Sequence, residues 1–433
     1  MNKLYLLIIT LIVCSASSAQ KAPFVYKNII EDEKGICLVV SGRKVYADKP
    51  DDSFKFIDLY GNPKGHQLGI DLDFKHPRLN GILYYGFINY NGAKMPQTVF
   101  FRKSAKIKGG KSSIDIKQNL SGRYDMVGWE ESRKGILGYR IVLGNGAILY
   151  DGKLAFTHNE LKFKPEPTLI EGPFINKLEP NSVVISFTTS KQIKASVKVN
   201  GKSYKDKNPV FHHEIKIDKL EPNTTYDYTV KIKRFKFSYQ FKTAPEPGSR
   251  NKFTFAYASD SRSGLGGGER DIFGVNAYIM KRVASLAKSE GAEFVQFTGD
   301  LINGYETSKE RMKLQYSNWK HSIEPFGHYI PFIAGFGNHE AYVYKFHDKY
   351  EDRYYMVDHF PFKDNSSESV FQDNFINVEN GPESEDGTEY DPDTNKIDFP
   401  SYKETVFCNW KQIRISIIFL LQSTHRFSQM GAM

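Results

Sequence analysis

The chain has only three cysteines among its 433 residues, at positions 14, 37 and 408. Cysteines so far apart in sequence do not form the dense pattern of a small disulfide-stabilised domain. Neither Cys37 nor Cys408 has a second cysteine or a histidine at the spacing of a zinc site. Disulfides and cysteine-bound metal are therefore not what organises this protein.

The sequence also lacks blocks of one charge. It carries 59 Lys and Arg against 50 Asp and Glu, which gives a net charge of +9. A basic balance favours anionic partners in general. Here the lysines are scattered along the chain and are not gathered in runs with interleaved aromatic residues, so we expect no nucleic acid partner.

No apolar stretch approaches the ~20 residues that a membrane-spanning helix needs. Residues 4–13 are apolar, follow Lys3 and precede the small residues Ser-Ser-Ala at 17–19. This order predicts a signal peptide over residues 1–19. We expect a secreted or periplasmic protein without stable membrane insertion; an uncleaved membrane anchor is the alternative.

Proline-rich segments divide the chain into predicted domains. They are Pro-Glu-Pro at 165–167 and Ala-Pro-Glu-Pro-Gly at 244–248. Many short β-prone runs separated by turns predict an all-β domain over residues 20–165, and a cleaner alternation predicts a second β-sandwich over 168–245. An α/β domain is expected over 251–433, which makes the fold multidomain.

The second β-rich segment contains Leu-Glu-Pro-Asn-Thr-Thr-Tyr-Asp-Tyr-Thr-Val at 220–230. This stretch resembles the fibronectin type III signature, in which Leu, Pro, Tyr and the following apolar strand build one corner of the sandwich. The adjacent His212 and His213 would point to opposite faces of a strand, so they do not suggest a metal site.

Three apolar, β-prone runs in the third domain each precede a polar motif. The runs at 253–258, 294–297 and 329–334 lead into Ser-Asp-Ser-Arg at 259–262, Thr-Gly-Asp at 298–300 and Gly-Asn-His-Glu at 337–340. Helical periodicity over 271–290, with Asp271 near its start, and over 308–323 separates the strands. Strand, helix and strand in this order predict a parallel sheet. Residues 413–421 are predicted to form a further strand.

Because ligands gather at the carboxyl ends of parallel strands, we expect the three motifs to meet at one edge of the sheet. Asp260, Asp300 and Asn338 would supply oxygen ligands there for a hydrolytic metal site. The alternative for each residue taken singly is turn or cap chemistry, since Asp and Asn are common after strands.

The three motifs in this order resemble the calcineurin-like metallophosphoesterases, and among them the secreted purple-acid-phosphatase-like enzymes with upstream β-sandwich domains. The resemblance implies a layered β-sandwich flanked by helices and a small phosphate ester as substrate. It also implies two transition-metal ions, of Fe, Mn or Zn, that activate a hydroxide. By this resemblance Asp260 binds the first ion, Asp300 bridges both and Asn338 binds the second. His339 faces the leaving group, and Arg262 holds the substrate phosphate.

The chain departs from the family pattern in three respects. Arg262 stands where many relatives place a histidine ligand, and Tyr305 lies farther from Asp300 than the tyrosine of purple acid phosphatases. The family also ends its ligand set with Gly-His-x-His, which this chain lacks; beyond Glu340 its histidines are those at positions 347, 359 and 425. We therefore expect an incomplete second metal site and a C-terminally incomplete domain.

Several alternatives remain open at the level of sequence. One is a catalytically impaired remnant that acts as an extracellular binding protein through its β domains. Another is a phosphodiesterase or nucleotidase, because the loops that select the substrate cannot be interpreted. The glycine-rich stretch at 264–268 lacks the Gly-Lys-Ser/Thr ending of a phosphate-binding loop, so we expect a loop bordering the site. The sequence does not indicate the oligomeric state.

Overall fold

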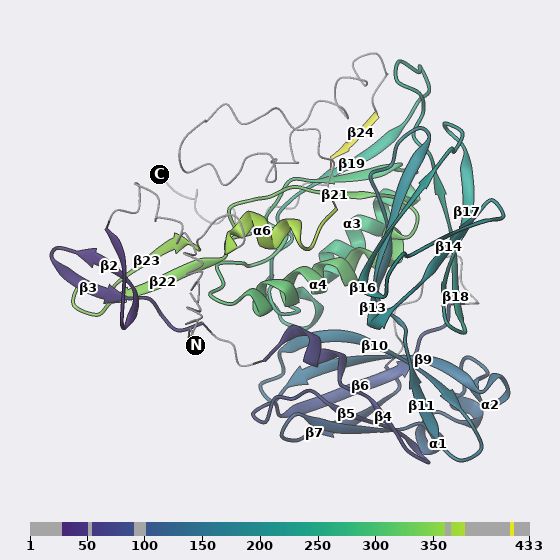
Figure 1. Cartoon of the computed structure of the whole chain (residues 1–433), viewed down its shortest axis with the longest axis horizontal. Helices are drawn as coiled ribbons and strands as arrows, with labels where there is room; N and C mark the ends of the chain where they lie inside the picture. The colour runs from purple at the N-terminus through teal and green to yellow at the C-terminus, as the bar shows by residue number, and fades with distance from the viewer. Residues whose placement is uncertain (1–27, 51–53, 91–100, 360–364, 377–415, 420–433) are drawn as a thin grey trace, which may run out of the picture.

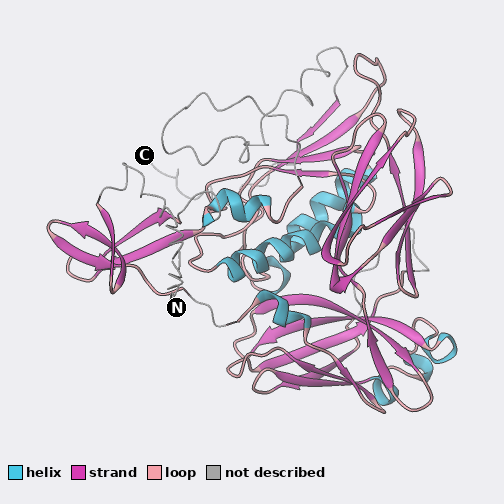
Figure 2. Cartoon of the chain, viewed as in Figure 1, coloured by secondary structure: helices cyan, strands magenta, loops and turns pink. Residues whose placement is uncertain are grey.

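The computed structural model describes residues 28–50, 54–90, 101–359, 365–376 and 416–419, the last of these as backbone (Figure 1). The predicted signal peptide, Cys14, Cys408 and His425 lie outside these residues. The described part combines two β-sandwiches with one region in which helices pack beside a sheet (Figure 2). The multidomain architecture expected from the sequence is thus confirmed, while the exact domain boundaries stay predictions.

The first β-sandwich consists of a five-stranded and a three-stranded sheet. The strand order is β11-β10-β9-β6-β7 in the larger sheet and β4-β5-β8 in the smaller one. Alternating side chains of both sheets bury a core that includes Tyr139, Tyr150 and Phe156. The bounds are β4 (Lys64–Gly65), β5 (Gly69–Asp73), β6 (Gly81–Phe87), β7 (Lys103–Ile107), β8 (Lys111–Asp115), β9 (Lys134–Leu143), β10 (Ile148–His158) and β11 (Phe163–Glu166).

Short helical turns complete this sandwich. They are η2 (Phe56–Tyr60), α1 (Ile116–Asn119), η3 (Gly122–Tyr124) and α2 (Trp129–Ser132). The carboxylate of Asp115 caps α1 by accepting the Gln118 amide at 2.8 Å. Each turn is too short to form a layer of its own.

The first three strands of the chain do not join this sandwich. β1 (Ile29–Asp32), β2 (Gly35–Val40) and β3 (Arg43–Tyr46) form a separate antiparallel sheet. This sheet packs on the hairpin of β22 (Val343–Asp348) and β23 (Arg353–Asp358). Ala47, just after β3, forms an antiparallel β-bridge with Phe346 of β22. Residues about 300 positions apart therefore share one small core.

The second β-sandwich pairs the sheet β12-β13-β16 with the sheet β15-β14-β17-β18. The amide of Glu221 donates to the Tyr226 hydroxyl at 2.8 Å, which closes the sandwich corner that the fibronectin-like stretch predicts. His213 is buried and His212 is exposed, as strand alternation requires. The bounds are β12 (Leu169–Asn176), β13 (Ser182–Ile193), β14 (Ser196–Val199), β15 (Lys202–Lys205), β16 (Val210–Asp218), β17 (Thr225–Ile232) and β18 (Phe235–Lys242).

The α/β region contains a parallel sheet of order β21-β20-β19-β24. Its strands are β19 (Thr254–Ala258), β20 (Phe294–Phe297), β21 (Phe332–Ala334) and β24 (Ser416–Phe419). β21 is shorter than the predicted run at 329–334 because Tyr329 and Ile330 still bond back to the Phe326 carbonyl at the end of the preceding helix. The predicted final strand is confirmed for 416–419; the rest of 413–421 lies outside the described residues.

The helices of this region are η4 (Gly268–Arg270), α3 (Ala277–Ser289), α4 (Lys309–Gly327) and α6 (Ser367–Gln372). The prediction that the first long helix begins near Asp271 is wrong. Asn276 caps α3 by accepting the Ile279 amide at 3.2 Å, whereas Asp271 accepts the Gly274 amide in a preceding turn. The Ile272–Val275 bridge delays the helix by one turn. No helix in the described ranges is long and apolar enough to cross a membrane.

Helix α4 holds the two sandwiches and the α/β region together. Buried ion pairs join its Glu324 to Lys153 in the first sandwich and its Lys320 to Glu171 in the second. His328, directly after the helix, lies 2.7 Å from the Pro173 carbonyl. Figure 1 shows α4 at the centre of the molecule between these elements. The sheet that carries the three motifs is therefore linked through α4 to both sandwiches.

Candidate metal centre

The three motifs lie side by side at the carboxyl edge of the parallel sheet. The register pairs Ala258 with Phe297 and Phe297 with Ala334, so β19, β20 and β21 end at the same level. Asp260, Asp300 and Asn338 follow these ends by two to four residues. The structure thus gathers the residues that the sequence singles out as ligands, with Asp300 on the middle strand.

The turns at this edge are tight and depend on glycine. Gly299 has φ +100°, and a Cβ there would lie 2.6 Å from the backbone of Gly337. Asp260 and Asp300 themselves adopt φ of +59° and +55°, a conformation that costs free energy for residues other than glycine. The Ser261 amide donates to the Asp300 carbonyl at 2.9 Å, which fixes the first motif against the second.

The Asp300 carboxylate occupies the centre of the edge. Its Oδ1 accepts the His339 backbone amide at 3.2 Å. Its Oδ2 lies 3.9 Å from Arg262 Nε and 4.0 Å from His339 Nε2, which is beyond hydrogen-bond length. One carboxylate oxygen is thus held by backbone, while the other faces two nitrogen side chains and remains available to a cation.

Arg262 and His339 contact each other directly across the edge. The His339 Nδ1 is 2.8 Å from the Asn303 carbonyl, which accepts hydrogen bonds only. Nδ1 therefore carries a proton, and in the neutral ring Nε2 accepts from the Arg262 guanidinium. Asn303 also accepts from the Ser263 hydroxyl at 2.9 Å, so it ties the glycine-rich loop to the same edge.

Tyr305 reaches the site although it lies five residues after Asp300. Its hydroxyl accepts the Asn338 side-chain amide at 3.1 Å, and its ring stands edge-on to His339 with centroids 5.0 Å apart. Tyr305 has φ +50°, and the preceding Gly304 presses so closely on the His339 carbonyl that no Cβ fits there. A strained turn thus brings Tyr305 back to the edge although its spacing from Asp300 is longer than in purple acid phosphatases.

Glu340 is a site residue to which sequence reasoning assigned no role. It is fully buried and accepts three backbone amides, from Gly337 at 2.6 Å, Asp300 at 2.9 Å and Leu301 at 2.7 Å. Burial raises the pKa of this carboxyl to about 7, although the three amides oppose the rise. Glu340 therefore joins the second and third motifs. Its position directly after His339 was the available signal, but a sequence does not show burial.

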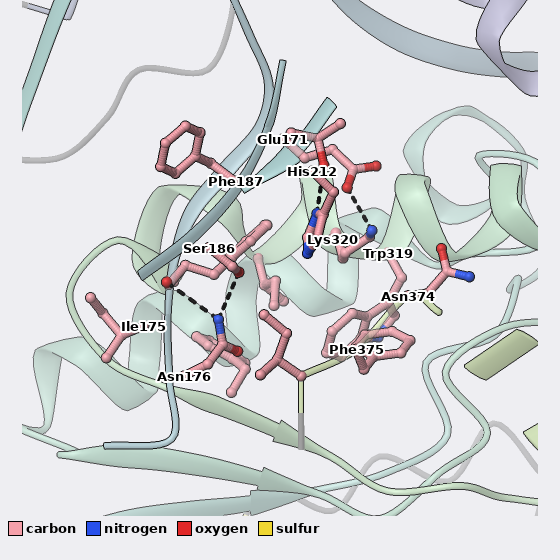
Figure 3. A pocket seen from close by; sticks show the side chains of 16 residues that line it. Glu171, Ile175, Asn176, Ser186, Phe187, His212, Trp319, Lys320, Asn374 and Phe375 are labelled. Atoms are coloured by element: carbon pink, nitrogen blue, oxygen red, sulfur yellow. Dashed lines mark hydrogen bonds and ion pairs between the residues drawn. The ribbon is translucent and has the colours of Figure 1, made fainter. Parts of the chain in front are cut away.

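Trp319 of helix α4 supports the first motif through a hydrogen bond. Its indole N–H donates to the Ser261 hydroxyl at 2.9 Å, and that hydroxyl donates to the Leu301 carbonyl at 3.0 Å. The same ring lines a pocket between α4 and the second sandwich, where Lys320 and Glu171 pair at 2.5 Å (Figure 3). This pocket contains none of the predicted ligands, so the candidate centre is the open strand edge.

The donor set at the edge is rich in oxygen. It comprises the carboxylates of Asp260 and Asp300, the exposed amide of Asn338 and the phenol of Tyr305. Carboxylate, amide and phenol oxygens are donor types that hard or borderline metal ions accept. Within the described ranges there is no cluster of three or more His, Cys, Asp or Glu side chains that could hold a metal.

The histidines beyond Glu340 do not complete the set within the described residues. His347 stacks on Tyr354 and lies 3.2 Å from Asp352, while His359 is stacked between Tyr342 and Tyr344. Strand β24 runs parallel to β19 and ends at the same edge, next to the Asp260 turn.

Comparisons with known proteins identify the domain that carries this edge. Residues 271–416 match the family model of the calcineurin-like phosphoesterases. The match includes Asp300, Asn338 and His339, whereas Asp260 and Arg262 precede it. No curated protein sequence matches the chain.

Solved structures similar to this chain include PhoD, at 17% identity over 39% of this chain and 38% of that one, with a TM-score of 0.31. A purple acid phosphatase from yellow lupin (Lupinus luteus) seeds is 13% identical over 64% of this chain and 55% of that one, with a TM-score of 0.33. The chain thus spans less than two thirds of either protein. From the family match, we conclude that the chain carries a calcineurin-like phosphoesterase domain downstream of its β-sandwiches.

Proposed function

We propose that this chain is a metal-dependent hydrolase of phosphate esters that acts at the edge formed by the three motifs. The family match supports a phosphoesterase-type hydrolase. The observation that carries the finer proposal is the convergence of Asp260, Asp300 and Asn338 on three adjacent strand ends, beside Arg262 and His339. The substrate we propose is a small phosphate ester.

Asp260, Asp300 and Asn338 would hold the metal, with Asp300 between two ions if both are present. Bound metal of this kind lowers the pKa of a water molecule and neutralises charge on the phosphoryl oxygens. The Oδ2 of Asp300, which lies 3.9 Å from Arg262 Nε, and the exposed carboxamide of Asn338 suit this role. We propose Fe, Mn or Zn as the metal, with the second ion dependent on ligands outside the described residues.

Arg262 would bind the phosphate of the substrate. Its guanidinium contacts the His339 ring and lies near the Asp300 carboxylate, so it is already placed at the edge. A phosphate offers two charged acceptors in the geometry of the guanidinium fork. Substrate binding would therefore draw Arg262 away from His339 Nε2.

His339 would then face the leaving group. The Asn303 carbonyl holds its Nδ1–H, which points Nε2 toward the open edge. Once Arg262 has moved to the phosphate, Nε2 would take up a proton from solvent, and the resulting imidazolium would pass that proton to the departing oxygen and return to the neutral ring. Tyr305 packs edge-on against the ring and limits its rotation.

A second candidate function is a binding protein whose phosphoesterase region is a remnant. The observation in its favour is the lack, among the described residues, of a group of three or more His, Cys, Asp or Glu side chains that could hold a metal.

The domain organisation and the location that we propose are the same under either function. The domains span residues 20–165, 168–245 and 251–433, after a signal peptide over residues 1–19. The protein would be secreted or periplasmic.

Hydrolysis of p-nitrophenyl phosphate and bis-p-nitrophenyl phosphate by the metal-loaded chain tests the proposal. We expect turnover that falls at least a hundredfold in D300N, because the central ligand is lost. The control is D352N, which changes an exposed aspartate far from the edge. Equal rates in D300N and D352N would contradict the assignment, and no turnover in the parent with any of the three metals would favour the binding protein.

A further inference from the structure

Strand pairing gathers lysines that are scattered in the sequence onto one sheet face. In the sheet β15-β14-β17-β18, Val197 and Val230 are buried, so their neighbours along each strand point outward. The register places Lys205, Ser196, Lys231 and Lys236 in one row across all four strands. The three lysines of this row are exposed.

A fourth exposed lysine, Lys198, stands in the next row, and we call these four residues the lysine face. Lys231 and Lys236 are direct cross-strand partners. Like charges placed opposite each other destabilise a sheet. Among the residues that the structure describes, no carboxylate pairs with any of the four lysines; the outward Asp227 accepts from Gln240 at 2.9 Å instead. The face therefore keeps a net positive charge.

The rest of the face carries short hydroxyl side chains. Its outward positions beside the lysines are Ser196, Ser203, Thr229 and Ser238, as the cross-strand register shows. The turn that joins β17 to β18 adds the exposed Lys233 and Arg234. Positive charge thus extends from the face onto the neighbouring turn.

The lysine face points away from the phosphoesterase region. Helix α4 packs against β12 in the opposite sheet of this sandwich. Figure 1 shows β14, β17 and β18 on the outer side of the molecule, with β13 and β16 between them and the helices. A large flat partner can therefore reach the face without touching the metal edge.

The chemistry of the face selects among anionic partners. Single-stranded nucleic acids need aromatic side chains on which bases stack, and no aromatic side chain occupies the outward positions of these strands. Discrete phosphate groups are held best by the forked contacts of arginine. A cluster of ammonium charges among short hydroxyl side chains suits the diffuse charge of anionic lipid head groups. We propose that the lysine face docks this protein on a membrane surface rich in anionic lipid, without insertion.

Co-sedimentation of the full chain with vesicles tests this proposal. The vesicles contain phosphatidylcholine alone or with 30% phosphatidylglycerol, at about 50 and about 300 mM salt, chosen to bracket the screening of surface charges. We expect binding to the anionic vesicles that weakens with salt, and at least tenfold weaker binding for K231E/K236E. The matched control is K216E/K219E, which makes the same charge change at exposed lysines on and beside the opposite sheet.

Two results would overturn the proposal. One is equal loss of binding in K231E/K236E and the control, because net charge and not the face would then be responsible. The other is retention on a soluble polyanion such as dextran sulfate without any binding to anionic vesicles, which would assign the face to a soluble polymer. Circular dichroism of both variants establishes that each is folded.

Discussion

His328 should make the protein sensitive to mild acid. The residue is almost completely buried where α4 meets the second sandwich. Its ring stacks on Tyr239 with centroids 4.1 Å apart, and its Nδ1 lies 2.7 Å from the Pro173 carbonyl. Burial lowers the pKa of His328 from 6.5 to about 3. The folded protein therefore holds this histidine neutral at pH values at which an unfolded chain would protonate it.

The sign and size of the effect follow from proton linkage. Above pH 6.5 His328 is neutral in both states and makes no contribution. As the pH falls below 6.5 the unfolded state binds a proton that the folded state refuses, so the free energy of unfolding decreases by about 1.4 kcal/mol per pH unit. At pH 4.5 the loss from this residue is about 2.7 kcal/mol. The further decrease in the free energy of unfolding ends as the pH approaches about 3, where His328 is protonated in the folded state as well.

Guanidinium-induced unfolding at pH 4.5, 5.5, 6.5 and 7.5, followed by tryptophan fluorescence, measures this slope. In H328Q the glutamine amide can still donate to the Pro173 carbonyl but does not titrate. We expect the slope below pH 6.5 to be shallower by about 1.4 kcal/mol per unit in this variant. H359Q removes a second buried histidine, whose pKa burial lowers to about 4, and its effect should add to that of H328Q. An H328Q slope equal to that of the parent would refute the reasoning.

Three further variants test other contacts. E340Q replaces one carboxylate oxygen with an amide nitrogen that cannot accept hydrogen bonds from backbone N–H groups. We therefore expect the free energy of unfolding to fall by about 2–3 kcal/mol in thermal melts. The control is E293Q, which makes the same change at a partly exposed carboxylate. E324A leaves Lys153 buried without its partner and should lower the free energy of unfolding by about 3–5 kcal/mol in denaturant titrations. The double variant K153M/E324L should recover most of that free energy. A double variant as unstable as E324A would contradict this reasoning. R262K keeps the charge but loses the guanidinium fork, so KM for p-nitrophenyl phosphate should rise at least fivefold; an unchanged KM would exclude Arg262 from substrate binding.

The position of the motif edge could be predicted because buried parallel strands leave a strong local pattern. The apolar runs that became β19 and β20 end two and three residues before Asp260 and Asp300, and parallel strands must end on the same side. The corner at Tyr226 was equally visible, since its hydrogen bond to Glu221 spans five residues. These features depend on neighbours in sequence or on the direction of a strand.

Other features depend on contacts that the sequence does not encode locally. Asp271 and Asn276 are both good helix caps, and the bridges that Ile272 and Val275 make between them hold the intervening residues in an extended form. The contact of Tyr305 with Asn338 requires a strained turn, and the three amide bonds of Glu340 require three loops to be in place. Such contacts become visible only when the fold is known.

The association of β1–β3 with the hairpin β22–β23 is a further case. Phe346 is fully buried against Ile29, Leu38 and Val45, which lie about 300 residues earlier. Both partners read as ordinary short strands with alternating side chains. Nothing in either pattern identifies the other as its partner. The prediction therefore grouped the first strands with the β-rich segment that follows them, in one domain over residues 20–165.

The metal content of the purified chain after dialysis is the most direct test of the central claim, that the edge formed by Asp260, Asp300 and Asn338 holds metal. Elemental analysis should find about one equivalent or more of Fe, Mn or Zn per chain in the parent, and less than a tenth of that in D300N, with D352N unchanged. Retention of the metal in D300N, or its absence from the parent after loading with each metal, would contradict the claim.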